Sequence, residues 1–291
     1  MNGVLIIDKP SGFTSHDVVA RVRHILKQRA VGHLGTLDPL ATGVLPLVLG
    51  NMTRLAQFYL ASEKSYDGMI RFGFATDTYD AEGESVGEPQ EPALTIEHVR
   101  DMAGKFVGTI EQTPPPFSAK KIDGVPAYKL ARKKRDVSLK PVSVEIKQFE
   151  ISTLEDSRAQ FAARVASGTY LRSIAHEMGQ LAGCGAHLES LRRTSVAEFQ
   201  LNDAHTLAEL EKAAQSGEVE NILVHPRQLL PLLPSVTATE EIAAKIRHGM
   251  AVNLSDFSRA REVKVFCGQR ELIAIATRVA GTLFHPRIVL V

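Results

Sequence analysis

The chain has 291 residues, enough for one large domain and a small one, and its 44% hydrophobic and 23% charged residues are typical of an ordinary globular protein. Its 34 basic and 33 acidic side chains leave a net charge of +1, which excludes an overall basic field, so any affinity for RNA must come from uneven charge placement. The N-terminal MNGVLIIDKP has no basic segment followed by a long apolar region, and no apolar run approaches membrane-spanning length, which predicts a cytoplasmic protein without membrane association.

The first third of the chain alternates apolar runs with turns. An opening strand is followed by a helix that Ser15 or Asp17 can cap. The apolar stripe of this helix consists of Val18, Val19, Val22, Ile25 and Leu26. Residues 44–50, VLPLVLG, predict a buried strand, and residues 51–62 have helical spacing. Alternation over residues 66–74 is typical of a half-buried strand.

Periodicity and turn signals also predict the later elements. In chain order we expect turn-rich sequence at 80–92, a helix around 96–106, strands near 142–151 and 160–166, and a helix over 172–181. Residues 229–234, LLPLLP, mark the clearest boundary, because two prolines bracket a short apolar piece. Short alternating strands beyond it predict a small β-barrel or sandwich. The expected fold class is α+β, with a mixed, mostly antiparallel sheet flanked by helices and a β-rich C-terminal domain.

Residues 32–43, GHLGTLDPLATG, place one carboxylate, Asp38, in a loop too rich in glycine and proline for a regular helix or strand. Pro39 pushes Asp38 toward an extended conformation, and Gly35 and Gly43 permit backbone geometry and close approach that other residues resist. The apolar strand that follows would hold this loop rigidly, and strand ends are common locations for functional sites. An isolated Asp-Pro pair would more often be simple turn chemistry.

The whole string resembles the catalytic motif of the TruB family, the bacterial tRNA pseudouridine-55 synthases. The matching positions are Gly32, His33, Gly35, Leu37, Asp38, Pro39, Leu40, Ala41, Thr42 and Gly43. Leu34 departs from the pattern, since many relatives carry a small hydroxyl residue there. Further segments match in the same order, at residues 3–19, 63–83, 167–179 and 183–196. Because these motifs cover most of residues 1–230, chance is a poor explanation, and the resemblance implies a pseudouridine synthase fold.

The reaction that the resemblance implies converts uridine to pseudouridine. It breaks the N-glycosidic bond and rejoins the uracil through C5, with no redox change and no added atom, so neither a cofactor nor a metal is needed. The cysteines, Cys184 and Cys267, have no metal-ligand spacing and are expected to be reduced, and the histidines are too scattered for a metal site. A glycoside hydrolase would usually need two carboxylates about 5 to 10 Å apart, and this loop offers one.

Three residues are implied to be catalytic. Asp38 would act as a nucleophile or as a base toward the ribose, and the sequence leaves both roles open. Arg172 would form an ion pair with Asp38, and its place at a helix start favours an acidic partner, since a cation is unfavourable there. Tyr66 would stack on the target uracil and help to remove the C5 proton. Without the resemblance, Tyr66 would be interpreted as a core residue of a strand.

The resemblance also implies a substrate-binding set. Tyr170 would contact the substrate, Leu191 would pack against the target base, and Tyr66 belongs to this set as well. Because the uridine must leave the helical stack at a cost of a few kcal/mol, something must stabilise the opened RNA. His33 would make that contact with RNA, whereas a proton-transfer dyad with Asp38 is a lesser alternative and a purely structural histidine is the default.

A basic segment compensates for the low net charge. Residues 120–135, KKIDGVPAYKLARKKR, hold seven basic residues and one acidic residue. A charge run is usually a solvated helix face, but here glycine and proline favour a projecting loop and helix. Residues 117–141 resemble the thumb that closes over the tRNA arm, with Ser118, Ala119 and Lys121 matching its pattern. The residues expected to bind RNA are Lys9, Lys120, Lys121, Lys129, Arg132 and Lys133.

The resulting expectation divides the chain in two. Residues 1–234 would form the catalytic domain, with the thumb insertion at 117–141, and residues 235–291 resemble a PUA domain, an RNA-binding module. The implied activity is isomerisation of uridine 55 in the T-arm loop of tRNA by a monomer without an obligatory protein partner. Two alternatives remain: a noncatalytic tRNA-binding or tRNA-folding protein, and a guide-RNA-dependent pseudouridine synthase subunit.

Overall fold

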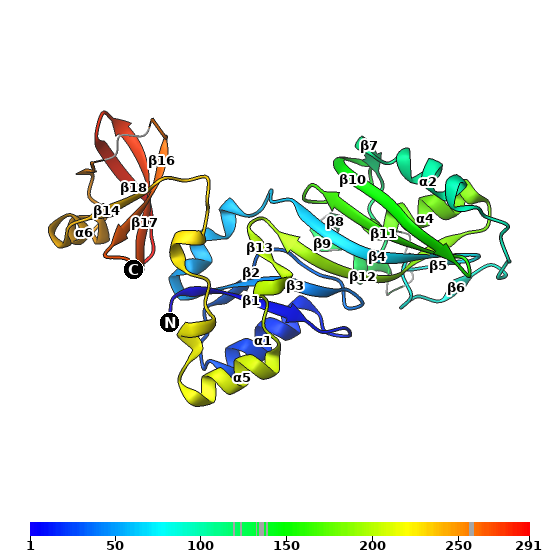
Figure 1. The fold of residues 1–291 in the computed structure, drawn as a ribbon, viewed down its shortest axis with the longest axis horizontal. Helices are drawn as coiled ribbons and strands as arrows, with labels where there is room; N and C mark the ends of the chain where they lie inside the picture. Colours follow the sequence, from blue (N-terminus) through cyan, green and yellow to red (C-terminus); the bar gives the residue numbers. More distant parts are fainter. Residues whose placement is uncertain (119, 123, 132, 134–136, 138, 256–258) are drawn as a thin grey trace.

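The computed structural model describes residues 1–118, 120–122, 124–131, 133, 137, 139–255 and 259–291. Its helices are α1 (Ser15–Ile25), α2 (Ile96–Gly104), α3 (Ala127–Ala131), α4 (Leu171–Ala182), α5 (Leu207–Ser216) and α6 (Glu240–Arg247). Short 3₁₀ helices are η1 (Gly50–Phe58), η2 (Leu201–Asp203), η3 (Val219–Ile222) and η4 (Pro226–Gln228). A long twisted sheet runs through most of the molecule, and a smaller sheet lies at one end (Figure 1).

Nine strands among the described residues form the large sheet. They are β1 (Gly3–Lys9), β2 (Val31–His33), β3 (Thr42–Leu49), β4 (Lys64–Phe72), β7 (Gly108–Gln112), β10 (Val142–Glu155), β11 (Arg158–Val165), β12 (Ala186–Val196) and β13 (Phe199–Gln200). The main order is β1-β3-β12-β4-β11-β10-β7, with β2 beside β3 and β13 beside β12. The β12–β3 pair is parallel, whereas the other pairs in this sheet are antiparallel. This parallel pair places the start of β3 beside the middle of β12.

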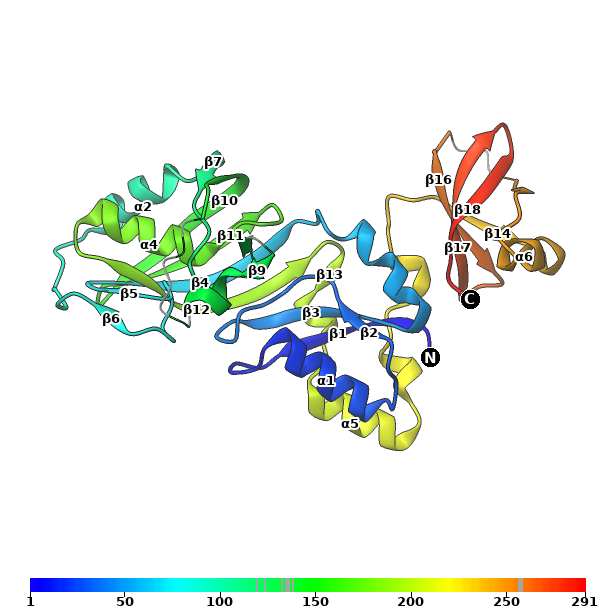
Figure 2. The same ribbon diagram turned by 180° about the vertical axis from the view of Figure 1, so that it is seen from behind.

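Two pairs of helices cover the large sheet (Figures 1 and 2). α1 and α5 lie against the β1 end, whereas α2 and α4 lie against the end that contains β10. One apolar cluster contains buried residues from both ends, including Val18 of α1, Met102 of α2 and Ile174 of α4. The helices therefore fix the two halves of the sheet against a common core.

The first helix begins one residue earlier than its sequence indicates. Thr14, rather than the expected Ser15 or Asp17, is the N-cap of α1, and Asp17 completes a capping box at the third helical position. Ser15 is buried, and its hydroxyl exchanges hydrogen bonds with the backbone of Leu37. Because Thr14 caps the helix, the hydroxyl of Ser15 is available to hold the loop that carries Asp38.

The region expected to form the thumb contains a short hairpin and a helix. The hairpin pairs β8 (Lys121–Ile122) with β9 (Val125–Pro126), and α3 follows directly. A second two-stranded ribbon, β5 (Ala75–Thr76) with β6 (Ser85–Val86), flanks the turn over residues 77–84. Ala119 of the expected thumb pattern and Arg132 of the expected RNA-binding set lie outside the described residues.

The C-terminal region forms a separate sheet. Its strands are β14 (Ser235–Ala238), β15 (Val252–Asn253), β16 (Glu262–Cys267), β17 (Glu271–Ala280) and β18 (Leu283–Val289), in the order β14-β16-β17-β18-β15. Helix α6 packs on it. Phe266 and Ile288 from this sheet share an apolar cluster with Val4 and Val48 of the large sheet. The two sheets are therefore joined by buried apolar contact as well as by the chain.

The expected α+β class is confirmed. The strands predicted within residues 44–50, 66–74, 142–151 and 160–166 and the helices within 96–106 and 172–181 are present, with ends shifted by a few residues. Residues 51–62 form the 3₁₀ helix η1 over their first part, and β12 and α6 were not predicted from the sequence. Every helix in the described part of the chain is too short or too polar to cross a bilayer.

Candidate active site

A cavity of about 350 Å³ opens between the two halves of the large sheet. This volume falls within the range of small-ligand pockets. Its walls come from the loop over residues 34–41, the start of β4, the segment leading into α4, and β12. All six residues expected to be catalytic or to bind the substrate line it: His33, Asp38, Tyr66, Tyr170, Arg172 and Leu191.

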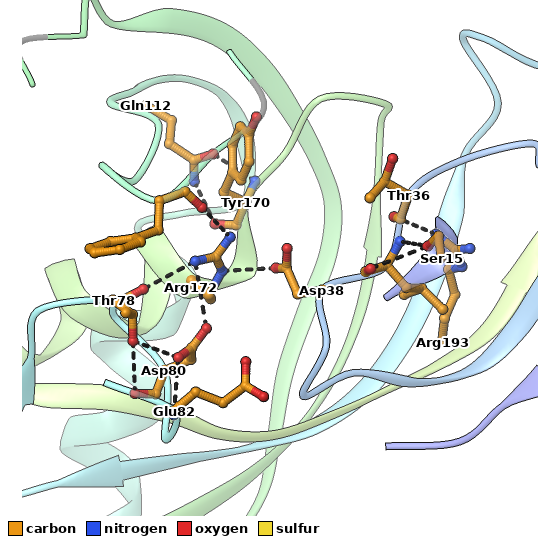
Figure 3. A network of polar contacts seen from close by, with 12 residues as sticks. Ser15, Thr36, Asp38, Thr78, Asp80, Glu82, Gln112, Tyr170, Arg172 and Arg193 are labelled. Atoms are coloured by element: carbon orange, nitrogen blue, oxygen red, sulfur yellow. Dashed lines mark hydrogen bonds and ion pairs between the residues drawn. The ribbon is translucent and has the colours of Figure 1, made fainter. Parts of the chain in front are cut away.

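Three side chains, Asp38, Arg172 and Asp80, form a row of ion pairs, and the first two of them line the cavity (Figure 3). Arg172 Nε lies 2.8 Å from an Asp38 carboxylate oxygen, as the sequence had predicted. On its other side, Arg172 Nη1 lies 3.5 Å from a carboxylate oxygen of Asp80. The side chains of Arg172 and Asp80 are only 5% and 4% exposed, whereas that of Asp38 is 38% exposed. Among these three side chains, Asp38 is therefore the one that a substrate can reach.

Backbone groups hold Arg172 in place. Its Nη1 donates to the carbonyl of Thr78 and its Nη2 donates to the carbonyl of Phe117, both at 3.1 Å. Asp80 is fixed in turn, because its Oδ1 accepts from the Thr78 hydroxyl at 2.6 Å and from the backbone N–H of Glu82 at 3.1 Å. A buried guanidinium with two carboxylates and two carbonyls has little freedom to turn, so Asp38 faces a fixed cation.

The loop that carries Asp38 is held from behind by side chains of other elements. Arg193 of β12 is fully buried and donates to the carbonyls of Gly35, Thr36 and Val44 at 3.0, 3.2 and 2.8 Å. Ser15 of α1 bonds the backbone of the next residue, Leu37. These bonds satisfy backbone groups that a loop without regular structure would otherwise leave unpaired.

Gly43 allows this loop to approach β12. Its φ is +98°, and a Cβ placed there would lie 2.2 Å from the backbone carbonyl oxygen of Arg193. Any side chain at this position would push β3 away from β12 and displace the loop with it. The expected close approach at Gly43 is thus a backbone contact with β12.

Lys9 does not have the RNA-binding role that its motif position predicted. Its side chain is completely buried, and its ammonium donates to the backbone carbonyls of Pro10, Phe13 and Pro39. Burial lowers the pKa of Lys9 to about 8, which leaves it protonated at neutral pH. A lysine whose donors are turned inward onto three carbonyls cannot reach a phosphate, so the prediction for this residue was wrong.

The apolar wall of the cavity comes from adjacent strands. Tyr66 on β4 pairs with Arg193 on β12, and Leu191 on β12 pairs with Gly68 on β4. Both Tyr66 and Leu191 are more than nine-tenths buried, at 8% and 9% exposure. A flat aromatic ring and an aliphatic side chain at one cavity wall suit contact with a planar base.

Tyr170 is positioned through its backbone by a residue that sequence reasoning missed. The side-chain amide of Gln112 accepts from the N–H of Tyr170 at 2.8 Å and donates to its carbonyl at 3.1 Å. Tyr170 is also the N-cap of α4, immediately before the turn that presents Arg172. Burial, and then the negative charge of Asp38, raises the pKa of Tyr170, so its phenol stays neutral.

His33 makes no hydrogen bond to Asp38 among the bonds of the described residues. Its Nδ1 accepts the backbone N–H of Gly35 at 3.3 Å, and its ring meets the ring of His16 edge-on at 5.8 Å between centroids. Burial, followed by the nearby charges of His16 and Arg193, lowers the pKa of His33 and favours the neutral imidazole. The proton-transfer dyad therefore has no geometric support in this structure.

The thumb lysines lie where a large ligand could touch them. Lys120, Lys121, Lys129 and Lys133 are exposed, while Arg132 lies outside the described residues. Asp80, Gln112 and Arg193 had no place in the sequence prediction. Asp80 lies where the matching segment 63–83 overlaps the turn-rich stretch, and the others are single polar residues within strands, so only their tertiary partners reveal their roles.

Comparisons with known proteins agree with this arrangement. A family profile described as "TruB family pseudouridylate synthase (N terminal domain)" matches residues 23–171, and one described as "tRNA pseudouridylate synthase B C-terminal domain" matches residues 172–233. The protein named tRNA pseudouridine synthase B in Solibacter usitatus (strain Ellin6076) is 47% identical and covers 100% of both chains. The protein of the same name in Aquifex aeolicus (strain VF5) is 38% identical over 99% of each chain.

Solved structures show the same fold. A structure titled "Crystal Structure of a Cbf5-Nop10-Gar1 Complex" contains a chain that matches with a TM-score of 0.71 at 25% identity, covering 99% of this chain and 85% of that one. "Structure of H/ACA RNP bound to a substrate RNA containing 2'-deoxyuridine" matches with the same TM-score at 24% identity and the same coverage. The fold is therefore that of the pseudouridine synthases, which are isomerases. The chain belongs to the TruB family of pseudouridylate synthases.

Proposed function

We propose that this enzyme converts uridine 55 in the T-arm loop of tRNA to pseudouridine. The observation that carries the proposal is Asp38, a carboxylate open to a cavity of about 350 Å³ and ion-paired with a buried arginine that Asp80 holds from behind. The printed name of the relatives, tRNA pseudouridine synthase B, supports tRNA as the substrate. We place the activity in the cytoplasm.

The proposed chemistry needs one carboxylate and a closed pocket for the base. The target uridine leaves the stack and enters the cavity, where Asp38 acts on the ribose as nucleophile or base. Arg172 keeps Asp38 ionised and oriented, and Tyr66 and Leu191 hold the uracil plane while it turns. Because the uracil is both leaving group and incoming group, the pocket must retain it between bond breaking and bond forming. The steps call for no cofactor.

The proposed domains follow the division expected from the sequence. Residues 1–234 carry the cavity, 117–141 form a thumb that contacts the tRNA arm through exposed lysines, and 235–291 form a PUA-like module that binds RNA. Tyr170 and His33 contact the RNA beside the target base. The enzyme acts as a monomer on bare tRNA.

Two alternatives use the same surface. A noncatalytic tRNA-binding or tRNA-folding protein would bind but not turn over, and the intact Asp38–Arg172 pair argues against loss of catalysis. A guide-RNA-dependent subunit would be inactive without partners. The solved structures with this fold include multi-component complexes, but the family profiles that match this chain are those of TruB. Activity of the purified chain on bare tRNA separates all three.

The test is tritium release from unmodified tRNA carrying C5-labelled uridine. Wild type should release tritium, a T-loop mutant substrate should block release, and Asp38→Asn should reduce the rate by at least about 10³-fold while keeping tRNA affinity. Tight tRNA binding without tritium release by the wild type would refute the proposal and favour one of the alternatives.

A further inference from the structure

The cavity that contains Asp38 has three basic side chains in its wall: His33, Lys64 and Arg172. Arg172 is neutralised by Asp38 and Asp80, and burial keeps His33 neutral by lowering its pKa. Lys64 is different, because no carboxylate lies within ion-pair distance of it among the described residues. Its ammonium donates to the backbone carbonyl of Ser62 at 2.8 Å, and this is its sole hydrogen bond within the described part of the chain. Lys64 is thus an uncompensated cation of the cavity.

The fold fixes where this ammonium lies. Lys64 begins β4, two residues before Tyr66, so both side chains leave the strand on the same side. The lysine stem passes the loop of Asp38: a Cβ on Gly35 would lie 3.3 Å from Lys64 Cε. Leu60, which lines the cavity, is 73% exposed, and Ser62, whose carbonyl accepts from Lys64, lies two residues after it. Lys64 therefore lies at the entrance, above the wall formed by Tyr66 and Leu191.

The electrostatic position of Lys64 is unfavourable in the free protein. Burial, and then the charge of Arg193, lowers the pKa of Lys64 to about 8, so it is still protonated at neutral pH. A partly buried ammonium that has N–H donors without acceptors is stabilised most strongly by an anionic acceptor. Any nucleotide whose base enters this cavity is flanked by two phosphodiesters near its entrance.

We propose that Lys64 binds a phosphodiester of the RNA strand next to the nucleotide in the cavity. This inference rests on the proposed function, since it takes RNA as the ligand. It assigns to Lys64 a substrate-binding role that complements Asp38: the carboxylate meets the ribose, and the ammonium holds the strand on which that ribose is carried. The ligand is the phosphate anion of the backbone, so the contact is independent of base identity.

The first test measures binding of a T-arm stem-loop RNA in an Asp38→Asn background, so that turnover does not interfere. Lys64→Met should weaken binding about 10- to 100-fold, the range of a hydrogen bond to a charged group, and lower the salt slope by roughly 0.7 to 1. Lys64→Arg, which keeps the charge, should retain most of the affinity and the slope. Lys212→Met removes an exposed lysine of α5 as a matched control and should change neither.

The second test locates the phosphate on the RNA. A single methylphosphonate replaces the phosphodiester on the 5′ or the 3′ side of the target uridine and removes its charge. One of the two RNAs should bind the Lys64 protein about 10-fold or more weakly, but should bind the Lys64→Met protein with the same affinity as unmodified RNA. This non-additivity is specific to a direct contact.

Three results would overturn the inference: equal loss with Lys64→Met and Lys212→Met, equal methylphosphonate effects with and without Lys64, or no effect of either methylphosphonate on the protein that retains Lys64. The last measurement needs no Lys64 variant, so it holds even if Lys64→Met fails to fold. The binding readout is also independent of tritium release. A wild type that binds with phosphate coupling but releases no tritium would refute the proposed function and support the Lys64 contact.

Discussion

Lys9 is a structural residue, because its ammonium donates to backbone carbonyls at the loop that carries Asp38. Lys9→Met should lower the free energy of unfolding by at least about 1 kcal/mol, because the carbonyls of Pro10, Phe13 and Pro39 lose their donor. Urea denaturation measures this loss. The salt slope of RNA binding should stay unchanged, whereas exposed Lys129→Met should lower that slope without changing stability. A lowered slope with unchanged stability for Lys9→Met would restore the original RNA-binding interpretation.

Asp80 offers a test of the buried ion-pair chain. Asp80→Asn keeps an oxygen for the Thr78 hydroxyl but removes the negative charge that fixes Arg172 on the side opposite Asp38. We expect the single-turnover rate to fall roughly 10- to 100-fold, equivalent to about 1.4 to 2.7 kcal/mol, with RNA affinity within about 2-fold of wild type. Asp77→Asn, an exposed carboxylate in the same turn, should leave the rate unchanged. Lost affinity with an unchanged rate would show that Asp80 serves binding instead.

The residue-level prediction from sequence found the ion pair of the cavity but failed where tertiary contacts decide which way a side chain points. Asp38 and Arg172 were paired from the sequence, and the pair is present. The sequence around Lys9 is compatible with an ammonium that points either outward or inward. Only the path of the surrounding backbone decides between these two directions. Gln112 meets Tyr170 across 58 positions of chain, and a single glutamine in a strand carries no local signal of such a contact.

Close contact between α4 and β12 positions the two sides of the cavity, because α4 carries Arg172 and β12 carries Leu191. Gly179 makes this contact possible: a Cβ there would lie 2.0 Å from the backbone nitrogen of Ala186. Gly179→Ala should therefore lower the free energy of unfolding by about 3 kcal/mol or more, since the neighbour is backbone and cannot move aside.

A matched glycine gives the control in thermal denaturation. Gly104, at the end of α2, has no atom within 4 Å of the position of a Cβ, and Gly104→Ala should change stability by no more than about 1 kcal/mol, in the stabilising direction. Equal melting temperatures for the two variants would contradict the close-packing argument.

At the level of elements, strands in which apolar and polar residues alternate regularly could be predicted, whereas strands in which this alternation is interrupted could not. β12 shows why. Its pairing with β4 shifts register between Leu188 and Ser190 and again between Arg193 and Ser195, so its apolar positions do not keep a period of two. Residues 186–196 were therefore not predicted as a strand, although β12 lies in the middle of the large sheet. Bulges of this kind are visible only in the pairing of strands.

The whole molecule has a shared core beneath both sheets. Phe266 of β16 is fully buried in the apolar cluster that contains Val4 of β1, and the guanidinium of Arg227 lies 4.4 Å above its ring centroid. Phe266→Ala should lower the free energy of unfolding by about 3 to 5 kcal/mol, and calorimetry should show one transition that shifts as a unit. Ile273, whose cluster lies within the C-terminal region, gives a comparison through Ile273→Val. Two separate transitions, with only one moved by Phe266→Ala, would show that the sheets unfold independently.

The fold class was predictable at this scale because motifs and periodicity extend along the chain. The apolar contact between the C-terminal sheet and β1 was not, since both partners are strands buried on both faces, and their sequences do not indicate which element covers each face. Net charge also says little at this scale, because +1 for the whole chain coexists with a cavity in which Lys64 has no counter-ion among the residues that the structure describes.

The support beneath the Asp38 loop has a consequence for the RNA partner under the proposed function. Because Arg193, Ser15 and Lys9 already hold the loop, the free protein presents a nearly finished site, and little of the energetic cost of recognition comes from reshaping the enzyme. That cost lies in the RNA, whose extruded conformer is the competent minority of its ensemble. Apparent affinity then scales with the population of this conformer, so the enzyme ranks RNA loops by how readily they open.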